Sequence, residues 1–464
     1  MTIGKIKVEK VRSDKFYYVV SKEMEYRISS SNLTQDPGCK ILMDDLIQDL
    51  PVEFDLIGNR CENVRLYSPL SDKMRDILKK VSGNHPGLFI DKYAYVWHNQ
   101  ESMIYILNKV KKINNIQQKK CKEYEVLLNR RRGYLNELNK KKTAQIWQQK
   151  ISSPLLLHSS RTGTVENANL CFHPLYGFVY IPGSGIKGMT HAWAETVWLP
   201  GENRSKEALE QVERIFGWSK KIVEKGKEIL SSNTGHIIFH EAWPTKWPKI
   251  FVDITNCHYK KYYGAEENDN YNAPGDWEDP NPVNFLAVKP DGETAFEFAI
   301  SKRNASVKDA DLERAKEWVI AALEHLGAGG KTNSGNGVFS PPGNVPTTPI
   351  PAQSNLMEFD TIIELGTPAF LAGSQQQEDD CNLRGGTLRG MLRYWWRTLH
   401  ADHVSIDTLR RMERAVWGST LRGSPVQCKI TSKKFTKAQK FYKYQIKDLL
   451  SIEEDVKYRY RVHV

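Results

Sequence analysis

Hydrophobic and polar positions change their period along the chain, and the first part has the period of strands. Between residues 3 and 68, short runs alternate apolar with polar residues or cluster β-branched and aromatic ones. Five such runs can be distinguished: KIKVEKV, KFYYVVS, EMEYRIS, VEFDLIG and ENVRLYS. Five short strands in succession predict a small β-barrel.

Helical spacing appears in three later segments. The segment 109–150 suits a helix or a helical hairpin, with apolar positions at Val126, Leu127, Leu135, Leu138, Ile146 and Trp147. The segment 309–326 predicts an amphipathic helix with one apolar face, formed by Leu312, Ala315, Val319, Ala322, Leu323 and Leu326. A third helix is predicted over TLRGMLRYWWRTLHA (387–401).

A short glycine-containing turn occurs twice in the chain. The stretch YIPGSGIKGM (180–189) is echoed by NLRGGTLRGM (382–391), so that Gly183, Lys187 and Trp193 align without gaps with Gly385, Arg389 and Trp395. Two further pairs follow the same order, namely ERIFGWS with ERAVWGS and SPLLLHSS with TPAFLAGS. Three ordered matches indicate two copies of one module.

These patterns predict five parts. They are a barrel (1–68), a basic helical segment (69–150), the first module (151–340), a linker rich in Pro, Ser and Thr (341–356) and the second module (357–464). The second module has no glycine-rich segment near its C-terminus and looks incomplete beside the first. Its missing strands come from another chain, or the gene product is longer or split. The sequence leaves both readings open.

Composition and charge narrow the class of protein. The apolar content, 40%, is that of a globular chain, and no run approaches a membrane span. The first ten residues have no apolar run of a secretory signal, and seven scattered cysteines form no C-x-x-C pair, so a reducing cytoplasm is expected. Residues 109–150 carry 13 Lys or Arg against 3 Glu, which accounts for nearly all of the net charge of +11. This block favours a nucleic acid over an anionic membrane, although a solvated helical face explains it equally well.

The repeated turns are candidate anion-binding sites. Glycines let backbone N–H groups approach a phosphate where a helix begins, and the helix N-terminus adds partial positive charge. The predicted contacts of the first turn are Gly183, Ser184, Gly185, Lys187, Gly188 and His191, and those of the second are Gly385, Thr387, Arg389, Gly390, Arg393 and Arg397. The competing reading is that the glycines serve only close helix–strand packing.

A glycine-rich loop, LGAGGKTNSGNGVF (326–339), follows the helix predicted over 309–326. Its GGKT is not a nucleotide-binding P-loop, because His325 stands where the first glycine is needed and the loop closes a helix instead of opening one. We expect the loop to lie against a nucleic-acid backbone before a strand, NGVFSP. The predicted contacts are Gly329, Gly330, Lys331, Thr332, Asn333 and Gly335.

Aromatic residues of the predicted barrel are candidate base-stacking groups. The strand order resembles that of a cold-shock or OB-type domain, in which the second and third strands form a stacking platform. Phe16, Tyr18 and Tyr26 would form it here, while Tyr17 faces the other side. The competing reading places half of these rings in the core. Of Trp395 and Trp396, one is expected in the core, because adjacent helical residues point about 100° apart.

The ordered motifs of both modules resemble the RAMP superfamily of CRISPR proteins. The first module carries HPLYGFVYIPGSGIKGMTHAWAE, IFGWS, GHIIFHEAWP, DITNCHYKKYYG, NPVNFLAV and LGAGGKTNSGNGVF, and it resembles the sixth subunit of type III-B Cmr effector complexes. The second, with IIELGTPAFLAGS, NLRGGTLRGMLRYWWRTL and AVWGST, is similar to the start of the first Cmr subunit. The N-terminal barrel and basic segment, and the fusion of the two modules, depart from that pattern.

The resemblance implies an α+β fold of ferredoxin-like, RRM-derived modules. It implies a non-catalytic subunit that binds the 3′ region of a CRISPR guide RNA, helps capture target RNA, and assembles with other RAMP subunits of a Cmr complex. No cofactor and no metal are expected: His236 and His240 cannot complete a zinc site alone, and the acids of 269–282 lack calcium-loop spacing.

RNA endonuclease activity is the alternative. RNA-cutting members of the superfamily use an Asp in the loop before the glycine turn. That loop contains Glu166 and no Asp in the first module, but Asp379 and Asp380 in the second.

Overall fold

The computed structural model describes the parts of the chain on which the following account rests. These are residues 2–11, 14–21, 24–33, 51–57, 60–66, 85–90, 100–118, 122–157, 170–224, 227–264, 274–275, 277–343, 345–363, 371, 373–374, 383–419, 422–430, 436–437, 450–451 and 457–463. Helices and strands are mixed along the chain, as expected for an α+β protein.

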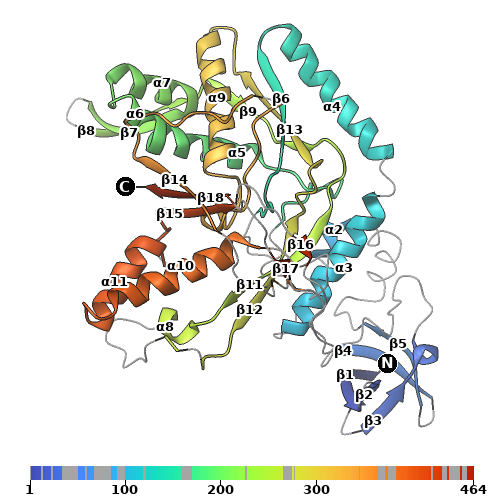
Figure 1. Ribbon diagram of the computed structural model, residues 1–464. Coiled ribbons are helices and arrows are strands. Elements are labelled where there is room, and N and C mark those ends of the chain that lie inside the picture. The colour runs from blue at the N-terminus through green and yellow to red at the C-terminus, as the bar shows by residue number, and fades with distance from the viewer. Residues whose placement is uncertain are drawn as a thin grey trace.

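The N-terminal strands form one antiparallel five-stranded sheet at one end of the molecule (Figure 1). Its order is β3-β2-β1-β4-β5, from β1 (Thr2–Val11), β2 (Asp14–Ser21), β3 (Met24–Ile28), β4 (Pro51–Ile57) and β5 (Arg60–Leu66). A parallel bridge joins Leu33, just after β3, to Val64 of β5, which brings the two outer strands of this sheet together. Its core contains Ile6, Val19, Val52, Phe54 and Val64.

Helices α3 (Gln100–Gln118) and α4 (Lys122–Lys140) pack on the first module. The buried Asn114 of α3 accepts a hydrogen bond from the indole N–H of Trp247 at 2.8 Å and donates one to the carbonyl of Pro248 at 3.0 Å. The helical prediction is wrong beyond residue 140, since Ile146 and Trp147 lie in strand β6 (Ala144–Lys150). Trp147 stacks on Phe298 with ring centroids 5.8 Å apart. The packing of these side chains in the sheet therefore determines the strand conformation, even though the helical spacing of apolar residues continues to this point.

The sheet of the first module is antiparallel and centred on β13 (Ala295–Lys302), which pairs with β6, β9 (Ile237–Phe239) and β10 (Trp243–Pro244). Two helices, α5 (Gly183–Trp193) and α9 (Asp309–His325), pack against each other on one face of this sheet. Helix α4 covers the other face, because Glu297 points to it while Phe296 and Phe298 point to the core on the α9 side. Figure 1 shows α9 and α4 on either side of β6 and β13.

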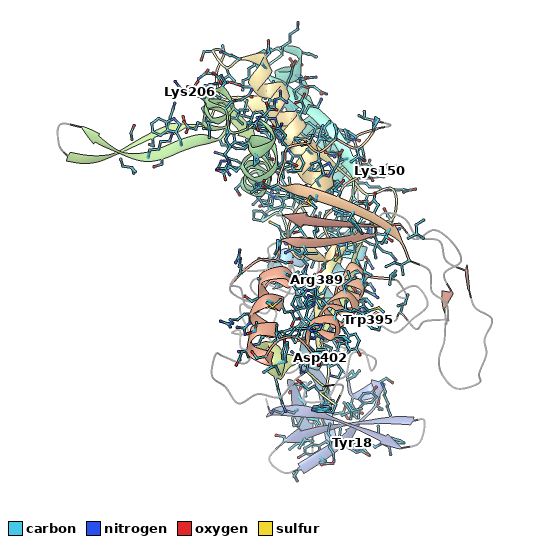
Figure 2. All side chains as sticks on the ribbon, turned by 60° about the vertical axis from the view of Figure 1, so that its left-hand side comes forward. Tyr18, Lys150, Lys206, Arg389, Trp395 and Asp402 are labelled. Atoms are coloured by element: carbon cyan, nitrogen blue, oxygen red, sulfur yellow. The ribbon has the colours of Figure 1, made fainter. Side chains whose placement is uncertain are left out.

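Helix α5 continues through a π-helical turn, η5 (Ala194–Trp198), into the short α6 (Leu199–Gly201), and α7 (Lys206–Phe216) follows. After α7, the hairpin of β7 (Gly217–Glu224) and β8 (Lys227–Thr234) projects away from the body of the molecule (Figure 2). The remaining elements are the two-stranded sheet of β11 (Ile250–Cys257) and β12 (Asn281–Val288), the short helices α2 (Pro86–Leu88) and α8 (Lys260–Gly264), and 3-10 turns at Ser30–Asn32 (η1) and Thr332–Ser334 (η6).

The proline-rich linker contacts the first module at Thr348 and Pro351. The buried His325 contacts the carbonyl of Thr348 at 2.6 Å, and Glu324 accepts a hydrogen bond from the amide of the same residue at 2.7 Å. A side chain at Gly201 would collide with Pro351 at 2.4 Å. The linker therefore fixes where the second module begins.

The second module repeats the start of the first. Its sheet has the order β14-β18-β15, from β14 (Leu356–Ile362), β15 (Val426–Ile430) and β18 (Lys457–His463), and helices α10 (Gly385–His400) and α11 (Ile406–Trp417) lie beside it. A short pair, β16 (Thr436–Lys437) and β17 (Leu450–Ser451), is separate. Among the described helices of the whole chain, none is both long and apolar enough to cross a membrane.

Candidate nucleic-acid interface

The first turn lies at the N-terminus of α5, and several of its predicted contact residues are exposed. Gly183 must be glycine, because a Cβ there would lie 2.2 Å from the carbonyl oxygen of Phe239. Ser184, Gly185 and Gly188 are exposed, and Lys187 is half-buried with no ion pair or hydrogen bond to the described residues. Pro182 supplies no side-chain cap, so the first-turn amides are available to an anion.

His191 lies one turn beyond Lys187 on the same side of α5. Its imidazole is 3.3 Å from the carboxylate of Glu195, and its ring lies 4.5 Å from that of Phe216. The first turn therefore presents the unpaired Lys187 next to a histidine that already has an acidic neighbour.

Arg389 of the second turn is not presented to a ligand, which corrects the sequence-based assignment. Its guanidinium donates hydrogen bonds to the carbonyls of Asn333 at 3.2 Å and Val426 at 3.0 Å, and also to the carbonyl of Trp417. Burial lowers the pKa of Arg389. Gly385 is equally enclosed, because a Cβ there would lie 2.2 Å from the carbonyl oxygen of Ser334. The second turn therefore holds the two modules together, whereas Thr387 and Gly390 stay exposed on α10.

Arg393 and Arg397 are also engaged within the protein, contrary to the prediction that they meet RNA. Both donate to Glu413 of α11 at 2.9 Å, and Arg397 donates to the hydroxyl of Tyr263 at 2.8 Å. The hydroxyl of Tyr262, on α8 of the first module, donates to the same carboxylate at 2.9 Å. Burial and the charge of Glu413 raise the pKa of Tyr262. Glu413 is thus the centre of a buried polar joint between the modules.

The glycine loop (326–339) is packed between the modules and is not an open cradle. Gln427 of β15 donates through its side-chain amide to the carbonyls of Leu326 and Thr332, both at 2.9 Å. A side chain at Gly329 would lie 1.8 Å from the carbonyl of Leu156, and one at Gly335 would lie 2.5 Å from that of Cys428. The amide of Gly330 donates to the same Leu156 carbonyl at 2.7 Å. The loop is therefore mainly a structural joint, which corrects the prediction that its glycines face RNA.

Lys331 is exposed at the surface of the loop, as is the backbone at Gly329. It adopts a left-handed backbone conformation with φ 55°, and its ammonium lies 5.1 Å from the ring centre of Phe285. Desolvation of the ammonium lowers the pKa of Lys331. Phe339, at the end of the loop, forms an isolated bridge to Ile151, where the sequence predicts a longer strand, NGVFSP.

The aromatic residues of the N-terminal sheet divide between its two faces. Tyr18 pairs with Arg27, and Arg27 lies 4.7 Å from the ring centre of Phe16, so these three residues share the outer face. Tyr26 is the exception to the predicted platform, because it packs on the core and its ring lies 5.7 Å from that of the buried Phe54. The outer face offers a smaller platform of two rings and one guanidinium.

The basic helix α4 uses part of its charge within the fold. Arg131 and Arg132 form ion pairs with the buried Glu297 at 2.8 and 2.7 Å, and Arg131 also lies over the ring of Trp243. Arg130, Lys140 and the neighbouring lysines remain exposed. Part of the charge of this block therefore serves the fold, and the rest lies on an exposed helical face.

The candidate catalytic acids Glu166, Asp379 and Asp380 lie outside the described residues. His236 and His240 have partners within the fold: His236 lies 3.9 Å from Asp311, and His240 is hydrogen bonded to Ser301 at 2.9 Å. Within the described ranges, no group of three or more His, Cys, Asp or Glu could hold a metal ion.

The polar joint around Glu413 was not found from the sequence. The sequence predicts that its arginines contact RNA, and its tyrosines lie about 150 residues away along the chain in DITNCHYKKYYG. The ion pair between Arg384 and Asp253, at 2.7 Å, is a second such contact. Glu413 is the first residue of ERAVWGS and Asp253 the first of DITNCHYKKYYG, but nothing in the spacing says that a partner comes from the other module.

Comparison with known proteins places these modules in a family. The RAMP superfamily model matches residues 150–340 and 362–463, more than half of the chain. The CRISPR system Cmr subunit Cmr6 of Pyrococcus furiosus is 31% identical over 204 residues, covering 35% of this chain and 58% of the relative. The chain thus matches less than two thirds of that relative's length.

Two solved structures are similar over part of the chain. One, the type III-B Cmr-beta bound to cognate target RNA, contains a chain 19% identical with a TM-score of 0.33, covering 57% of this chain and 89% of that one. The other, the crystal structure of Cmr6 from Pyrococcus furiosus, is 26% identical with a TM-score of 0.25, covering 43% and 97%.

Proposed function

Because the chain belongs to the RAMP superfamily, we propose that it is a non-catalytic RNA-binding subunit of a type III-B CRISPR effector complex. In this role it contacts the 3′ region of the guide RNA, helps capture target RNA and assembles with other Cmr subunits in the cytoplasm. The family match over both modules and the likeness of one part to Cmr6 support the assignment.

The open first turn is the observation that carries RNA binding. It combines exposed glycines, an uncapped helix N-terminus and the unpaired Lys187, which together suit a phosphate. The repeat provides its own comparison, since the equivalent Arg389 donates to three carbonyls of the joint. Of the two turns, only the first is therefore assigned to RNA. Lys331 of the glycine loop is a second contact.

Two finer features of the fold belong to the same proposal. The modules are ferredoxin-like, which the two helices on one face of an antiparallel sheet support in the first module. The N-terminal sheet is OB-like, which its strand order and the parallel Leu33–Val64 bridge support. Its outer face, with Phe16, Tyr18 and Arg27, then stacks a base of single-stranded RNA.

The assignment is tested by purifying the tagged chain from its native host and sequencing the RNA that co-purifies. Guides of uniform length derived from CRISPR repeats, together with sibling RAMP subunits, are expected. Unrelated cellular RNA, or no RNA, would remove the basis for placing this chain in a defence complex.

The contribution of the first turn is measured by the salt dependence of RNA affinity. Lys187→Ala should weaken binding to all sequences and lower the slope of log K against log salt concentration by about 1. Lys206→Ala, at an exposed position on α7 (Figure 2), is the matched control and should leave the slope unchanged. Equal slopes for Lys187→Ala and the unmodified chain would exclude a phosphate contact at the turn.

A further inference from the structure

The backbone that carries Lys331 has an unusual conformation and needs support from its surroundings. Residues 331–335, here called the lysine turn, consist of Lys331, the 3-10 turn η6 and Gly335. Both ends of the turn are left-handed, with φ 55° at Lys331 and 77° at Gly335. A left-handed backbone is disfavoured for a residue with a Cβ, so a lysine keeps it only where neighbouring contacts fix the chain.

The first of these contacts comes from Gln427 in β15 of the second module. Its side-chain amide donates to the carbonyl of Thr332 at 2.9 Å, directly after Lys331 in the chain. The same amide donates to the carbonyl of Leu326, just after α9, also at 2.9 Å. Gln427 is 5% exposed, so its position is fixed by packing. One buried side chain of the second module therefore ties the lysine turn to the end of α9.

The next two carbonyls of the turn also meet the second module. Arg389, labelled on α10 in Figure 2, donates to the carbonyl of Asn333 at 3.2 Å. The carbonyl of Ser334 packs on Gly385, where a Cβ would lie 2.2 Å away. Three consecutive carbonyls of the lysine turn are thus in contact with the second module.

The acid next to Lys331 is held by the second module as well. The Lys331 ammonium lies near the ring of Phe285 in β12, and Phe285 is paired in register with Asp253 of β11. Desolvation lowers the pKa of Lys331, and the charge of Asp253 opposes this shift, so the carboxylate acts on the ammonium.

Asp253 is nevertheless paired with a different cation. Its carboxylate accepts from the guanidinium of Arg384, in the second module, at 2.7 Å and from the amide of Ile254 at 2.9 Å. Among the described residues, Lys331 forms no ion pair of its own. The arginine therefore neutralises the acid that would otherwise compete for the lysine.

We infer that the second module serves RNA binding through the first module: Gln427 and Arg384 are positioning residues that present Lys331 to a phosphate of the RNA backbone. Gln427 fixes the turn, and Arg384 keeps Asp253 away from the ammonium. The inference rests on the proposed RNA contact of Lys331, and it gives the repeated module a role that requires no RNA contact of its own.

A double-mutant cycle tests the role of Gln427. The affinity of the full chain for a fluorescein-labelled single-stranded oligouridine is measured by anisotropy at a series of salt concentrations. Gln427→Met keeps the length of the side chain and removes both donors, so it should lower the slope of log K against log salt concentration by about 1, as Lys331→Ala does. Combining these two changes should give no further loss, because both remove the same contact. Combining Gln427→Met with Lys187→Ala should lower the slope by about 2, because that contact is separate.

A rescue experiment tests the role of Arg384. Arg384→Met should lower the slope by about 1, because the released Asp253 carboxylate then pairs with Lys331. Adding Asp253→Asn should restore the slope, whereas a direct RNA contact or a purely structural role of Arg384 would not be rescued. Arg422→Met is the matched control, since this exposed arginine of the second module forms no side-chain ion pair with the described residues, and it should leave the slope unchanged.

The outcomes separate this inference from the proposed function. Unchanged slopes for both Lys331→Ala and Lys187→Ala would remove the proposed RNA contacts and the inference together. A lower slope for Lys331→Ala with unchanged slopes for Gln427→Met and Arg384→Met would overturn the positioning role alone. Additive losses for Gln427→Met and Lys331→Ala, or no rescue by Asp253→Asn, would do the same. Circular dichroism checks folding, and the Arg384 pair decides by itself should Gln427→Met not fold.

Discussion

The joint between the modules depends on one buried carboxylate, and Glu413→Gln should weaken it strongly. Glu413 is 1% exposed, and its oxygens accept hydrogen bonds from Arg393, Arg397, Tyr262 and Tyr263. Glutamine keeps the volume of the side chain but removes the charge. Arg397, whose side chain is 6% exposed, is then left as a buried cation without an ionised partner.

The size of the effect follows from the burial of that pair. Breaking a buried ion pair by removing one partner costs about 3–5 kcal/mol, because the remaining charge is not compensated. The glutamine carbonyl still accepts one hydrogen bond, so we expect the lower end, about 3 kcal/mol. A change of this size accelerates local opening by about a hundredfold, since each factor of ten corresponds to about 1.4 kcal/mol.

Hydrogen exchange measured by mass spectrometry reports this opening locally. Amides of α8 and of the facing ends of α10 and α11 should exchange about a hundredfold faster in the variant. Glu213→Gln is the matched control: this residue occupies the equivalent position of the first module, but pairs with Lys220 at a partly exposed site. Such pairs contribute about 0–1 kcal/mol. If exchange in α8 is the same in the Glu413 variant and in the unmodified chain, the joint does not depend on this carboxylate.

Three further predictions concern acid stability, the joint and catalysis. Burial raises the pKa of Asp311, but hydrogen bonds and charge from Arg214 outweigh this and hold the pKa below its ordinary value. Its stabilisation is therefore present above about pH 4 and lost as the pH falls through the folded value, so Asp311→Asn should flatten the acid limb of a plot of unfolding free energy against pH. Gly335→Ala should destabilise the joint by about 1–3 kcal/mol in denaturant unfolding, because the residue has φ +77° and faces the Cys428 carbonyl, whereas Gly390→Ala, with nothing within 4 Å, should stabilise α10 by up to about 1 kcal/mol. Asp379→Ala combined with Asp380→Ala should leave any cleavage of target RNA by the complex unchanged, and loss of cleavage would favour the nuclease alternative.

Local elements could be predicted where the sequence pattern and the packing agree. The spacing of Leu312, Ala315 and Val319 gives helix α9, and the alternation in residues 3–68 gives five strands. The prediction was wrong for Ile146 and Trp147. These residues continue the helical spacing of α4, but they pair with β13 across the sheet, and a pairing with residues about 150 positions away leaves no trace in local periodicity.

The roles of the site residues were harder to predict, for a related reason. A glycine turn followed by a basic residue satisfies the same local rules whether its partner is a phosphate or a carbonyl of another module. Arg389 and Lys187 are equivalent in sequence, yet only Arg389 meets the carbonyls of Asn333 and Val426. The role of the basic residue depends on which residues pack against the turn, and the repeated motif alone does not identify those residues.

The same comparison explains why a motif can be repeated without its function being repeated. In the second module the turn is closed by Ser334 of the preceding glycine loop, so its glycine and arginine serve packing. In the first module Gly183 meets the carbonyl of Phe239 just as closely, but Lys187 has no hydrogen bond or ion pair to the described residues, and Gly185 and Gly188 have open space where a side chain would be. Exchanging the basic residues should therefore have unequal effects. Lys187→Ala is expected to change RNA affinity with little change in stability, while Arg389→Ala should lower the stability of the joint, because buried carbonyls lose their donors. Equal effects of the two variants on both RNA affinity and unfolding would show that the environment of the turns does not separate their roles.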